Sequence, residues 1–548
     1  MFTILKRSCC SVMFIVIFIA IPALAQDQPK RGGTVIVAVW QEPEHLSRAL
    51  RGTGVGNTIT AFVVEGLIDD DDKGENYPVL AEQVPTVENG GVSPDGKTVI
   101  YKLKKGVKWS DGSPFTCEDV QFTYKVNVGP GALTPGIYRN IQSVDCPDPF
   151  MAIIKWKNLY APYIQVFGTI FPRSAGDPAK PGSWGYTNKP LGTGPFKVDE
   201  FVKGDHVTLS RNENFREPGK PYLDKIIFRI LPSRENALQL VKTGQADVAH
   251  ALTEADIPDV ENMAGVRLSS APSSEVERMY LNLVKPGDPA DNKVPHPILG
   301  DLRVRQAIAY GINKQRIVDR LLGGRCPLGT SDFNIDPCKC SDIKPWPYDP
   351  AKARQLLEEA GWMVGPDGIR VKDGLRLRLK LQTTTGDKVR ENSEMFMAED
   401  MKAIGIEFYI DNQSVTYLHG TWAASPVRRG NFDIVMLAEG LFNPDPGMFM
   451  GIYLPVQIPS PENQSGANIT RWIDPQIGRL HGEALSILDW PKRKELYCKA
   501  AARTIEGVSQ IHLYQRLNLH AYRDRLQGWI PTTWGTIGWN AEDWWVKW

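Results

Sequence analysis

Short apolar runs alternate with helical patterns along much of this chain, and this alternation limits the possible folds more than any other feature. The apolar runs are short enough to be strands buried on both faces, and they cover residues 35–39, 226–231, 279–283 and 434–437. Helical patterns cover residues 234–243, 302–322, 350–360 and 388–404. Strands that alternate with helices in this way predict α/β domains built on mixed sheets.

A second kind of strand and a helix start are visible near residue 100. Residues 98–103 alternate apolar and polar side chains, which is typical of a half-buried strand. Thr116 can cap a helix, and Glu118 and Asp119 fall in its first turn, where the helix dipole favours acidic groups. We therefore expect a helix to begin at Thr116.

Residues 1–25 have the pattern of a secretory signal peptide. Lys6 and Arg7 form a positively charged start, residues 12–21 an apolar stretch, and small residues a cleavage site ending at Ala25. The apolar stretch has about ten residues, whereas a helix that spans a bilayer needs roughly 20. We expect cleavage after Ala25 and a soluble, secreted protein.

The length and charge of the remaining chain restrict its organisation and its partners. About 520 residues remain, well above the roughly 250 at which a single hydrophobic core stops growing, so at least two domains are required. Removing Lys6 and Arg7 from 63 basic residues leaves 61 against 63 acidic ones, a net charge of −2. Capture of nucleic acid or of an anionic membrane needs a basic surface, so we expect neither partner.

The commonest motifs of enzymes and of metal sites are missing from the sequence. It has no Walker phosphate loop, no HExxH pair and no G-x-S-x-G nucleophile elbow. The eight histidines, from His45 to His520, show no paired ligand spacing, and Cys338 and Cys340 are separated by one residue, which is not the usual zinc spacing. We expect no catalysis, no metal and no cofactor. The glycine-rich segment 52–56 lacks the spacing of a dinucleotide-binding turn and predicts a flexible loop.

An ordered series of motifs runs through the chain. Residues 191–230 contain a GTGP turn, the pair GDHV and the sequence PYLDKIIF. Companion motifs are GGTVIVAVWQEPEHLSRAL (32–50), SPDGKTVIYKLKKGVKWSDGSPFTCEDVQFTY (93–124), LRVRQAIAYGINKQRIV (302–318), YDPAKARQLLEEAGW (348–362) and AEDMKAIGIEFYI (398–410). Together they resemble the family 5 solute-binding proteins of bacterial ABC importers, which bind oligopeptides, dipeptides or nickel. The resemblance covers roughly residues 31–525.

The resemblance implies a two-lobed periplasmic-binding-protein fold of the α/β class, with mixed sheets and an extra inserted domain. Transferred by motif position, the expected parts are a discontinuous first lobe (26–65, 190–277 and 508–548), a small inserted domain (66–189) and a second lobe that closes over the ligand (278–507). The chain would pass between the lobes near 274–278 and 503–511, where we expect the hinge.

Six cysteines follow the signal peptide: Cys117, Cys146, Cys326, Cys338, Cys340 and Cys498. Export favours disulfides, but six cysteines allow fifteen full pairings. We expect Cys117 to pair with Cys146, since both lie in one predicted domain. We expect Cys326 to pair with Cys338 or with Cys340.

The resemblance also points to three places at which relatives hold their ligands. They are the loop after the first strand (Trp40, Gln41, Glu42), the strand end at Gln382 and Thr383, and the loop with Phe442, Asn443 and Asp445. Aromatic side chains outside these places add Tyr417, Trp422 and Trp534, the last of these from a tryptophan-rich C-terminal segment in which Trp529 and Trp539 could also stack on a ligand.

Two charged anchors of peptide-binding relatives fall on uncharged residues of this sequence. The aspartate that pairs with a peptide's amino terminus aligns with Phe442, and the arginine that clasps its carboxylate aligns with Thr383. A pocket that has neither charge disfavours a short zwitterionic peptide. A shift of a few residues in register would bring in Glu439, Asp445, Arg390 or Arg428 instead.

The resemblance implies a periplasmic substrate-binding component of an ABC transporter. Such a protein, expected here as a monomer, captures a peptide or peptide-like solute between its lobes and delivers it to the permease and ATPase subunits. Aromatic and amide groups suit neutral ligands too, so an oligosaccharide, opine or sugar conjugate is the alternative. A receptor-linked sensor or chaperone is another. An exported hydrolase that uses Glu42 and Glu44 is the remotest, because an acid–base pair needs carboxylates from separate elements.

Overall fold

The computed structural model describes residues 28–50, 52–130, 132, 135–441, 443–534 and 537–547. The predicted signal peptide, residues 1–25, lies outside the described residues, as does Phe442. Within the described ranges, no helix combines the length and the apolar character needed to cross a membrane.

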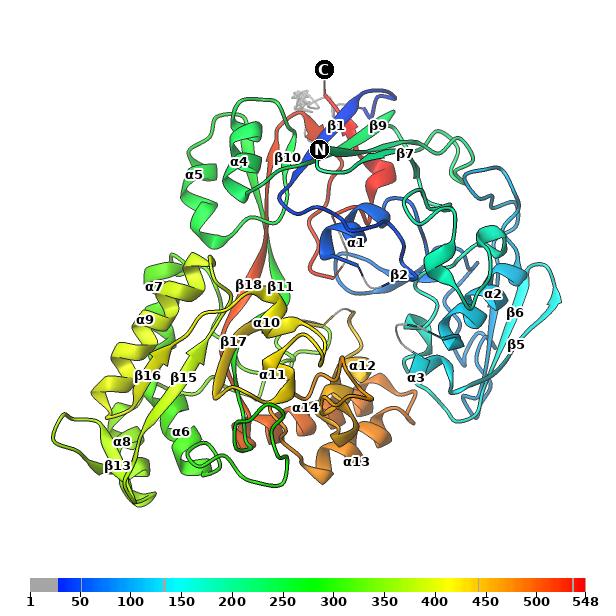
Figure 1. The fold of residues 1–548 in the computed structure, drawn as a ribbon. Helices are drawn as coiled ribbons and strands as arrows, with labels where there is room; N and C mark the ends of the chain where they lie inside the picture. Colours follow the sequence, from blue (N-terminus) through cyan, green and yellow to red (C-terminus); the bar gives the residue numbers. More distant parts are fainter. Residues whose placement is uncertain are drawn as a thin grey trace, which may run out of the picture.

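One mixed sheet of ten strands runs through the molecule, in the order β16-β15-β17-β11-β18-β10-β1-β9-β8-β7 (Figure 1). Its strands are β1 (Thr34–Val39), β7 (Phe196–Val202), β8 (His206–Arg211), β9 (Lys225–Ile230), β10 (Val248–Ala249), β11 (Val266–Leu281), β15 (Arg378–Gln382), β16 (Glu407–Ile410), β17 (Ile434–Glu439) and β18 (Gln510–Arg523). β1 is parallel to β9 and β10, whereas β11 is antiparallel to β17 and β18. The predicted α/β class with mixed sheets is confirmed.

Smaller sheets contain the other strands of the described residues. They contain β2 (Ile68–Asp70) with β3 (Asn76–Pro78), β4 (Thr98–Lys102) with β5 (Ile141–Asp148) and β6 (Met151–Trp156), β12 (Met363–Val364) with β13 (Arg370–Lys372) and β14 (Leu375–Arg376), and β19 (Leu526–Gln527) with β20 (Trp545–Val546). β4 fulfils the prediction of a half-buried strand at 98–103, because its side chains alternate between buried and more exposed positions.

The long strands β11 and β18 connect the two ends of the large sheet and lie side by side along most of their length (Figure 1). Their pairing is irregular between Pro272 and Val276, within and just before the predicted passage at 274–278. On β18 the matching irregularity lies between Gln515 and Leu517. Gln510 and Ile511 pair with the half of β11 that lies beside β17.

The helices are α1 (Gly54–Thr60), α2 (Cys117–Val128), α3 (Pro135–Tyr138), α4 (Arg234–Lys242), α5 (Ile257–Glu261), α6 (Leu302–Gly311), α7 (Lys314–Leu321), α8 (Pro350–Glu359), α9 (Lys388–Ala403), α10 (Val415–His419), α11 (Pro426–Arg429), α12 (Gly447–Met450), α13 (Pro475–Ala484) and α14 (Trp490–Gly507). The helix predicted to start at Thr116 is present, with Thr116 as its cap residue, and Asp119 Oδ2 accepts the Thr116 N–H at 2.9 Å.

Two local predictions were wrong. The single helix predicted over 302–322 is two helices, because Ile312 is extended and the Asn313 side chain caps α7 by accepting the N–H of Arg316. The glycine-rich segment predicted as a flexible loop contains the start of α1, because the Thr53 side chain accepts the N–H of Gly56 and caps that helix.

The GTGP motif is a close crossing of two backbone segments. A Cβ atom on Gly192 would lie 1.7 Å from the carbonyl oxygen of Val63, and one on Gly194 would lie 2.7 Å from it. Gly194 N–H donates to that same oxygen at 2.9 Å. Glycine is therefore required here because only a residue without a side chain can lie against the Val63 backbone.

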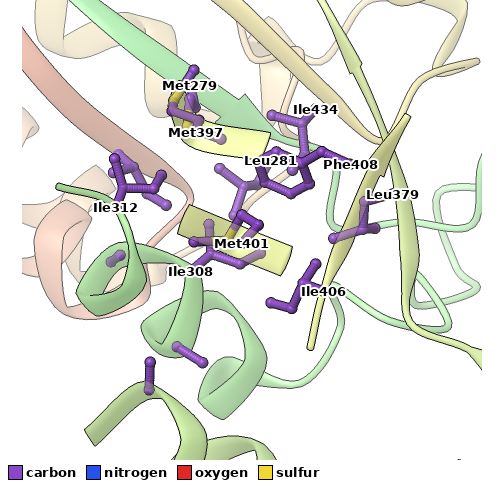
Figure 2. Close-up of a cluster of buried hydrophobic side chains, with 14 of the residues drawn as sticks. Met279, Leu281, Ile308, Ile312, Leu379, Met397, Met401, Ile406, Phe408 and Ile434 are labelled. Atoms are coloured by element: carbon purple, nitrogen blue, oxygen red, sulfur yellow. The ribbon is translucent and has the colours of Figure 1, made fainter. Parts of the chain in front are cut away.

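Several separate hydrophobic clusters form the core. Figure 2 shows the one in which α6 and α9 meet β11, β15, β16 and β17, with Ile308, Met401, Leu281, Leu379 and Ile434 among its buried side chains. A second cluster is built almost entirely from residues between 67 and 170. A third combines β1, α1 and β7–β9 with C-terminal residues such as Trp544.

Two disulfides are present. Cys117–Cys146 confirms the first predicted pairing and ties the start of α2 to β5. The second prediction was wrong: Cys340 pairs with Cys498 of α14, 158 residues away, while Cys326 and Cys338 are buried free thiols. Cys326 lies apart from the others, with its Sγ near Glu254 Oε1, and the segment around Cys340 packs against α14 in one cluster.

Candidate ligand site

Two adjoining cavities lie between segments that are far apart in the sequence. One has a volume of about 490 Å³ and the other about 650 Å³. Asn76, Ile164 and Gln165 line both, so the cavities share one wall. Further lining residues come from 48–70 and 534–542 at the smaller cavity, from 488–493 at the larger one and from 443–448 at both.

Three of the predicted site residues line these cavities. Asn443 and Trp534 line the smaller cavity, and Asp445 lines the larger one. Seven other predicted residues line neither cavity: Trp40, Gln41, Glu42, Gln382, Thr383, Tyr417 and Trp422. Phe442 is outside the described residues.

The side chains of the loop after β1 contact other parts of the chain and neither cavity. The guanidinium of Arg234, on α4, lies 4.0 Å from the centre of the Trp40 ring, which is a cation–π contact. The exposed Glu42 accepts the N–H of Gly204 at 2.8 Å, and Gln41 is exposed. These contacts hold the loop against neighbouring elements.

The side chains of Gln382 and Thr383 are fully buried, and each donates a hydrogen bond to a backbone carbonyl of another segment. Thr383 Oγ1 donates to the carbonyl of Met436 at 2.8 Å, and Gln382 Nε2 donates to the carbonyl of Asp411 at 3.2 Å. Tyr417 packs against a separate small cluster, and the Trp422 N–H donates to the carbonyl of Gln464. All four residues thus have structural contacts away from the cavities.

Asp445 forms a buried ion pair at the edge of the larger cavity. Its carboxylate is bonded to the Arg493 guanidinium and accepts the N–H of Gly447 at 2.9 Å. Arg493 also lies over the ring of Trp490, at 5.2 Å from its centre. Burial raises the pKa of Asp445, and the positive charge of Arg493 opposes this rise only in part. Asp445 and Arg493 therefore enter the cavity as a pair.

The other charged residues that a register shift would have recruited are occupied within the protein. Glu439 accepts the hydroxyl of Tyr280 at 2.6 Å, Arg390 pairs with Glu277 at 3.0 Å, and Arg428 donates to the carbonyls of Gly420 and Gly466. None of these three lines either cavity. Arg493, which sequence reasoning missed, carries no local motif that would have identified it.

The smaller cavity has an acidic wall that sequence reasoning also missed. Its carboxylates are those of Glu65, Asp69, Asp70 and Glu542. Glu65 pairs with Arg216 at 2.7 Å and accepts the hydroxyl of Thr193, a residue of the GTGP motif, at 2.8 Å. The run of four aspartates at 69–72 was a visible signal, but such a run is usually a solvated surface.

Two tryptophans of the C-terminal segment face the same cavity. The indole N–H of Trp534 donates to the carbonyl of Asp336, and that of Trp539 donates to the carbonyl of Ile530, both at 2.9 Å. Their polar edges are thus engaged. Both rings line the cavity, and Trp534 also packs against the cluster that includes Cys340 and Tyr497. Trp529, by contrast, packs against Tyr522 and Trp544.

Comparisons with known proteins agree with this architecture. The profile of the bacterial extracellular solute-binding proteins, family 5 Middle, matches residues 75–457. The oligopeptide-binding protein AppA of Bacillus subtilis is 26% identical over 533 residues, which cover 95% of this chain and 92% of AppA. The glutathione-binding protein GsiB of Shigella boydii is 25% identical over 417 residues, covering 72% of this chain and 77% of GsiB.

Solved structures show the same fold. AppA in complex with a nonapeptide has a TM-score of 0.77 at 24% identity and covers 95% of this chain and 100% of its own. NikZ of Campylobacter jejuni, in complex with Ni(L-His), has a TM-score of 0.81 at 21% identity and covers 94% of this chain and 99% of its own.

Proposed function

Since the chain belongs to the bacterial extracellular solute-binding proteins of family 5, we propose that it captures a peptide or peptide-like solute in the periplasm. The observation that carries this proposal is the pair of adjoining cavities, each within the roughly 300–1,000 Å³ of a drug-sized ligand site. Because the two cavities share a wall, together they suit an elongated ligand better than a compact ligand. The similarity to AppA supports the same solute class.

Capture depends on contacts from both sides of the cavities. We infer that 26–65, 190–277 and 508–548 act as one lobe with the insert 66–189, and that 278–507 closes over the ligand. Bending at the irregular pairing of β11 and at 515–517 of β18 would bring the walls together. A ligand that contacts both lobes favours the closed state, which a permease with its ATPase subunits then receives. No catalytic step is involved, and we expect a monomer.

The export signal forms part of the proposal. Removal of residues 1–25 would release the protein as a soluble periplasmic chain that starts at Gln26. N-terminal sequencing of the protein from a periplasmic extract tests the cleavage after Ala25.

The decisive test is mass spectrometry of the small molecules released by denaturing the protein after native purification from a periplasmic extract. A ladder of peptides would support the proposal. A single sugar-like or conjugated compound would replace it with the non-peptide alternative, which the ring faces of Trp534 and Trp539 and the amides of Asn76 and Gln165 favour.

Trp534→Ala should reduce the amount of co-purified ligand per protein, with affinity weakened about tenfold, or about 1.4 kcal/mol. The ring lines the cavity while only its edge is hydrogen-bonded. Trp40→Ala is the matched control, because Trp40 is also partly exposed and contacts Arg234 outside both cavities. Equal ligand retention by the two variants would remove Trp534 from the site.

A further inference from the structure

The insert 66–189 touches the proposed closing lobe at a place away from the two long strands. The Ala161 N–H of the insert donates to the carbonyl of Leu485 at 2.9 Å. Leu485 and Leu488, from the loop between α13 and α14, pack against the hydrophobic cluster that is built from residues between 67 and 170. Neither side of this contact belongs to β11 or β18, so it joins the two parts of the molecule independently of the hinge.

The start of α12 lies directly against the insert. A Cβ atom on Gly447 would lie 2.7 Å from Pro162 Cγ and 2.7 Å from the hydroxyl oxygen of Tyr497, and Figure 1 shows the insert beside α12. Gly447 is fixed from its own side, because its N–H donates to Asp445 at 2.9 Å and its carbonyl oxygen lies 2.7 Å from His481 Nε2. A residue without a side chain is therefore needed for α12 to approach Pro162 this closely.

The segment 159–163 is held in place by the insert itself. Tyr160 is buried, and its ring stacks on that of Trp156 with 5.3 Å between the ring centres. The Tyr163 hydroxyl donates to the carbonyl of Pro85 at 2.8 Å. Because the segment is fixed on both sides of Ala161 by contacts within the insert, its contact with the other lobe needs little further ordering of the chain.

The chemistry of the contact does not involve a solute. It consists of one backbone hydrogen bond and of apolar side chains, all of them neutral groups of the protein itself. A contact that exists only when the lobes are together stabilises the closed state whether or not a solute is present. It therefore adds to the solute's own contacts in keeping the lobes together.

We propose that residues 159–163 of the insert form a latch with Gly447 and the loop 485–488, and that this latch holds the two lobes together without a solute. The inference rests on the proposed function, because it takes 278–507 as the lobe that moves. It assigns the insert a task in closure, in addition to lining the cavities.

The test uses the full mature protein, freed of co-purified solute by unfolding in guanidinium, dialysis and refolding with its disulfides intact. Hydrogen exchange measured by mass spectrometry reports on the Ala161 amide, whose acceptor belongs to the other lobe, and small-angle X-ray scattering reports on the radius of gyration. We expect a protected amide in the ligand-free wild type. Gly447→Ala places a methyl group against Pro162, so the Ala161 amide should exchange about tenfold faster or more, and the radius of gyration should increase.

Two further variants separate the latch from local damage. Leu485→Ala removes an apolar contact with the insert without adding atoms, lines neither cavity, and should have the same two effects. It keeps the test decisive if Gly447→Ala disturbs its own lobe through Tyr497. Gly451→Ala is the matched control, because the nearest atom outside its own helix to the added methyl group is His481 Cε1, at 3.9 Å. This variant should behave like the wild type.

The outcomes distinguish the latch from the function beneath it. Faster exchange of the Ala161 amide in both variants without a change in the radius of gyration would overturn the latch, because the contact would then be local. An unprotected Ala161 amide in the ligand-free wild type would also overturn it, since the lobes would then meet only around a solute. Failure of the proposed function would appear as the absence of any released solute in mass spectrometry, and it would leave these exchange rates unchanged.

Discussion

Gly192→Ala should abolish folding or lower the free energy of unfolding by about 3 kcal/mol or more, beyond the usual range for overpacking. The added Cβ would lie 1.7 Å from the carbonyl oxygen of Val63, so one of the two backbones has to move. That movement would strain the neighbouring hydrogen bonds from Gly194 N–H to Val63 and from Phe196 N–H to Phe62. The yield of soluble protein and its urea midpoint measure the effect.

Gly482→Ala is the matched control for this substitution. Gly482 lies inside α13, and no heavy atom outside its own helix is within 4 Å of the position of the added Cβ. Alanine favours a helix interior by about 0.8–1 kcal/mol over glycine, so this variant should be as stable as the wild type or more stable. A Gly192 variant that matched its stability would show that the GTGP segment does not lie against Val63.

Asp332→Asn should lower the free energy of unfolding by about 3–5 kcal/mol, the usual effect of breaking a fully buried ion pair. The Asp332 carboxylate is bonded to Arg278 and to the hydroxyl of Tyr453, and its Oδ1 lies 3.1 Å from His512 Nε2. The side chains of Arg278 and Asp332 are 0% and 1% exposed. Asparagine keeps the size of the side chain but leaves the arginine charge in the core uncompensated.

The pKa of Asp332 is consistent with this dependence. Burial alone would raise it, but the Arg278 charge and the contact with His512 outweigh burial and lower it well below its usual value. Glu399→Gln is the control, since Glu399 pairs with Arg316 at 3.1 Å but is 65% exposed, so its loss should cost under about 1 kcal/mol. Similar urea midpoints for the two variants would contradict the role assigned to the buried pair.

The parts of the fold that depend on residues adjacent in the sequence could be predicted from the sequence. The run at 35–39 and the cap at Thr116 each act within one element, and both elements formed as expected. Interruptions were harder to predict because they depend on single side chains, such as the Asn313 cap that separates α6 from α7. The partner of Cys340 was missed because Cys498 follows it by 158 residues and only the tertiary fold brings the two close.

The candidate site was less predictable than the fold. Motif alignment selected residues near the ends of β1 and β15, but Trp40 and Thr383 contact neighbouring elements instead of the cavities. The cavity walls come from segments as distant as Asp70 and Glu542, so no local pattern marks them. Asp445 was selected, whereas the Arg493 that neutralises it lies 48 residues later, on α14.

The position of β18 determines when the molecule can be completed during synthesis and export. β18 ends at Arg523 and lies in the middle of the sheet, between β11 and β10, both of which are made more than 200 residues earlier. Until the ribosome has passed that point, these two earlier strands each have an open edge, and exposed edges invite pairing with other chains. A truncation shortly before residue 510 would therefore divide the sheet at its centre, so the two halves of the large sheet are joined only once β18 has been made.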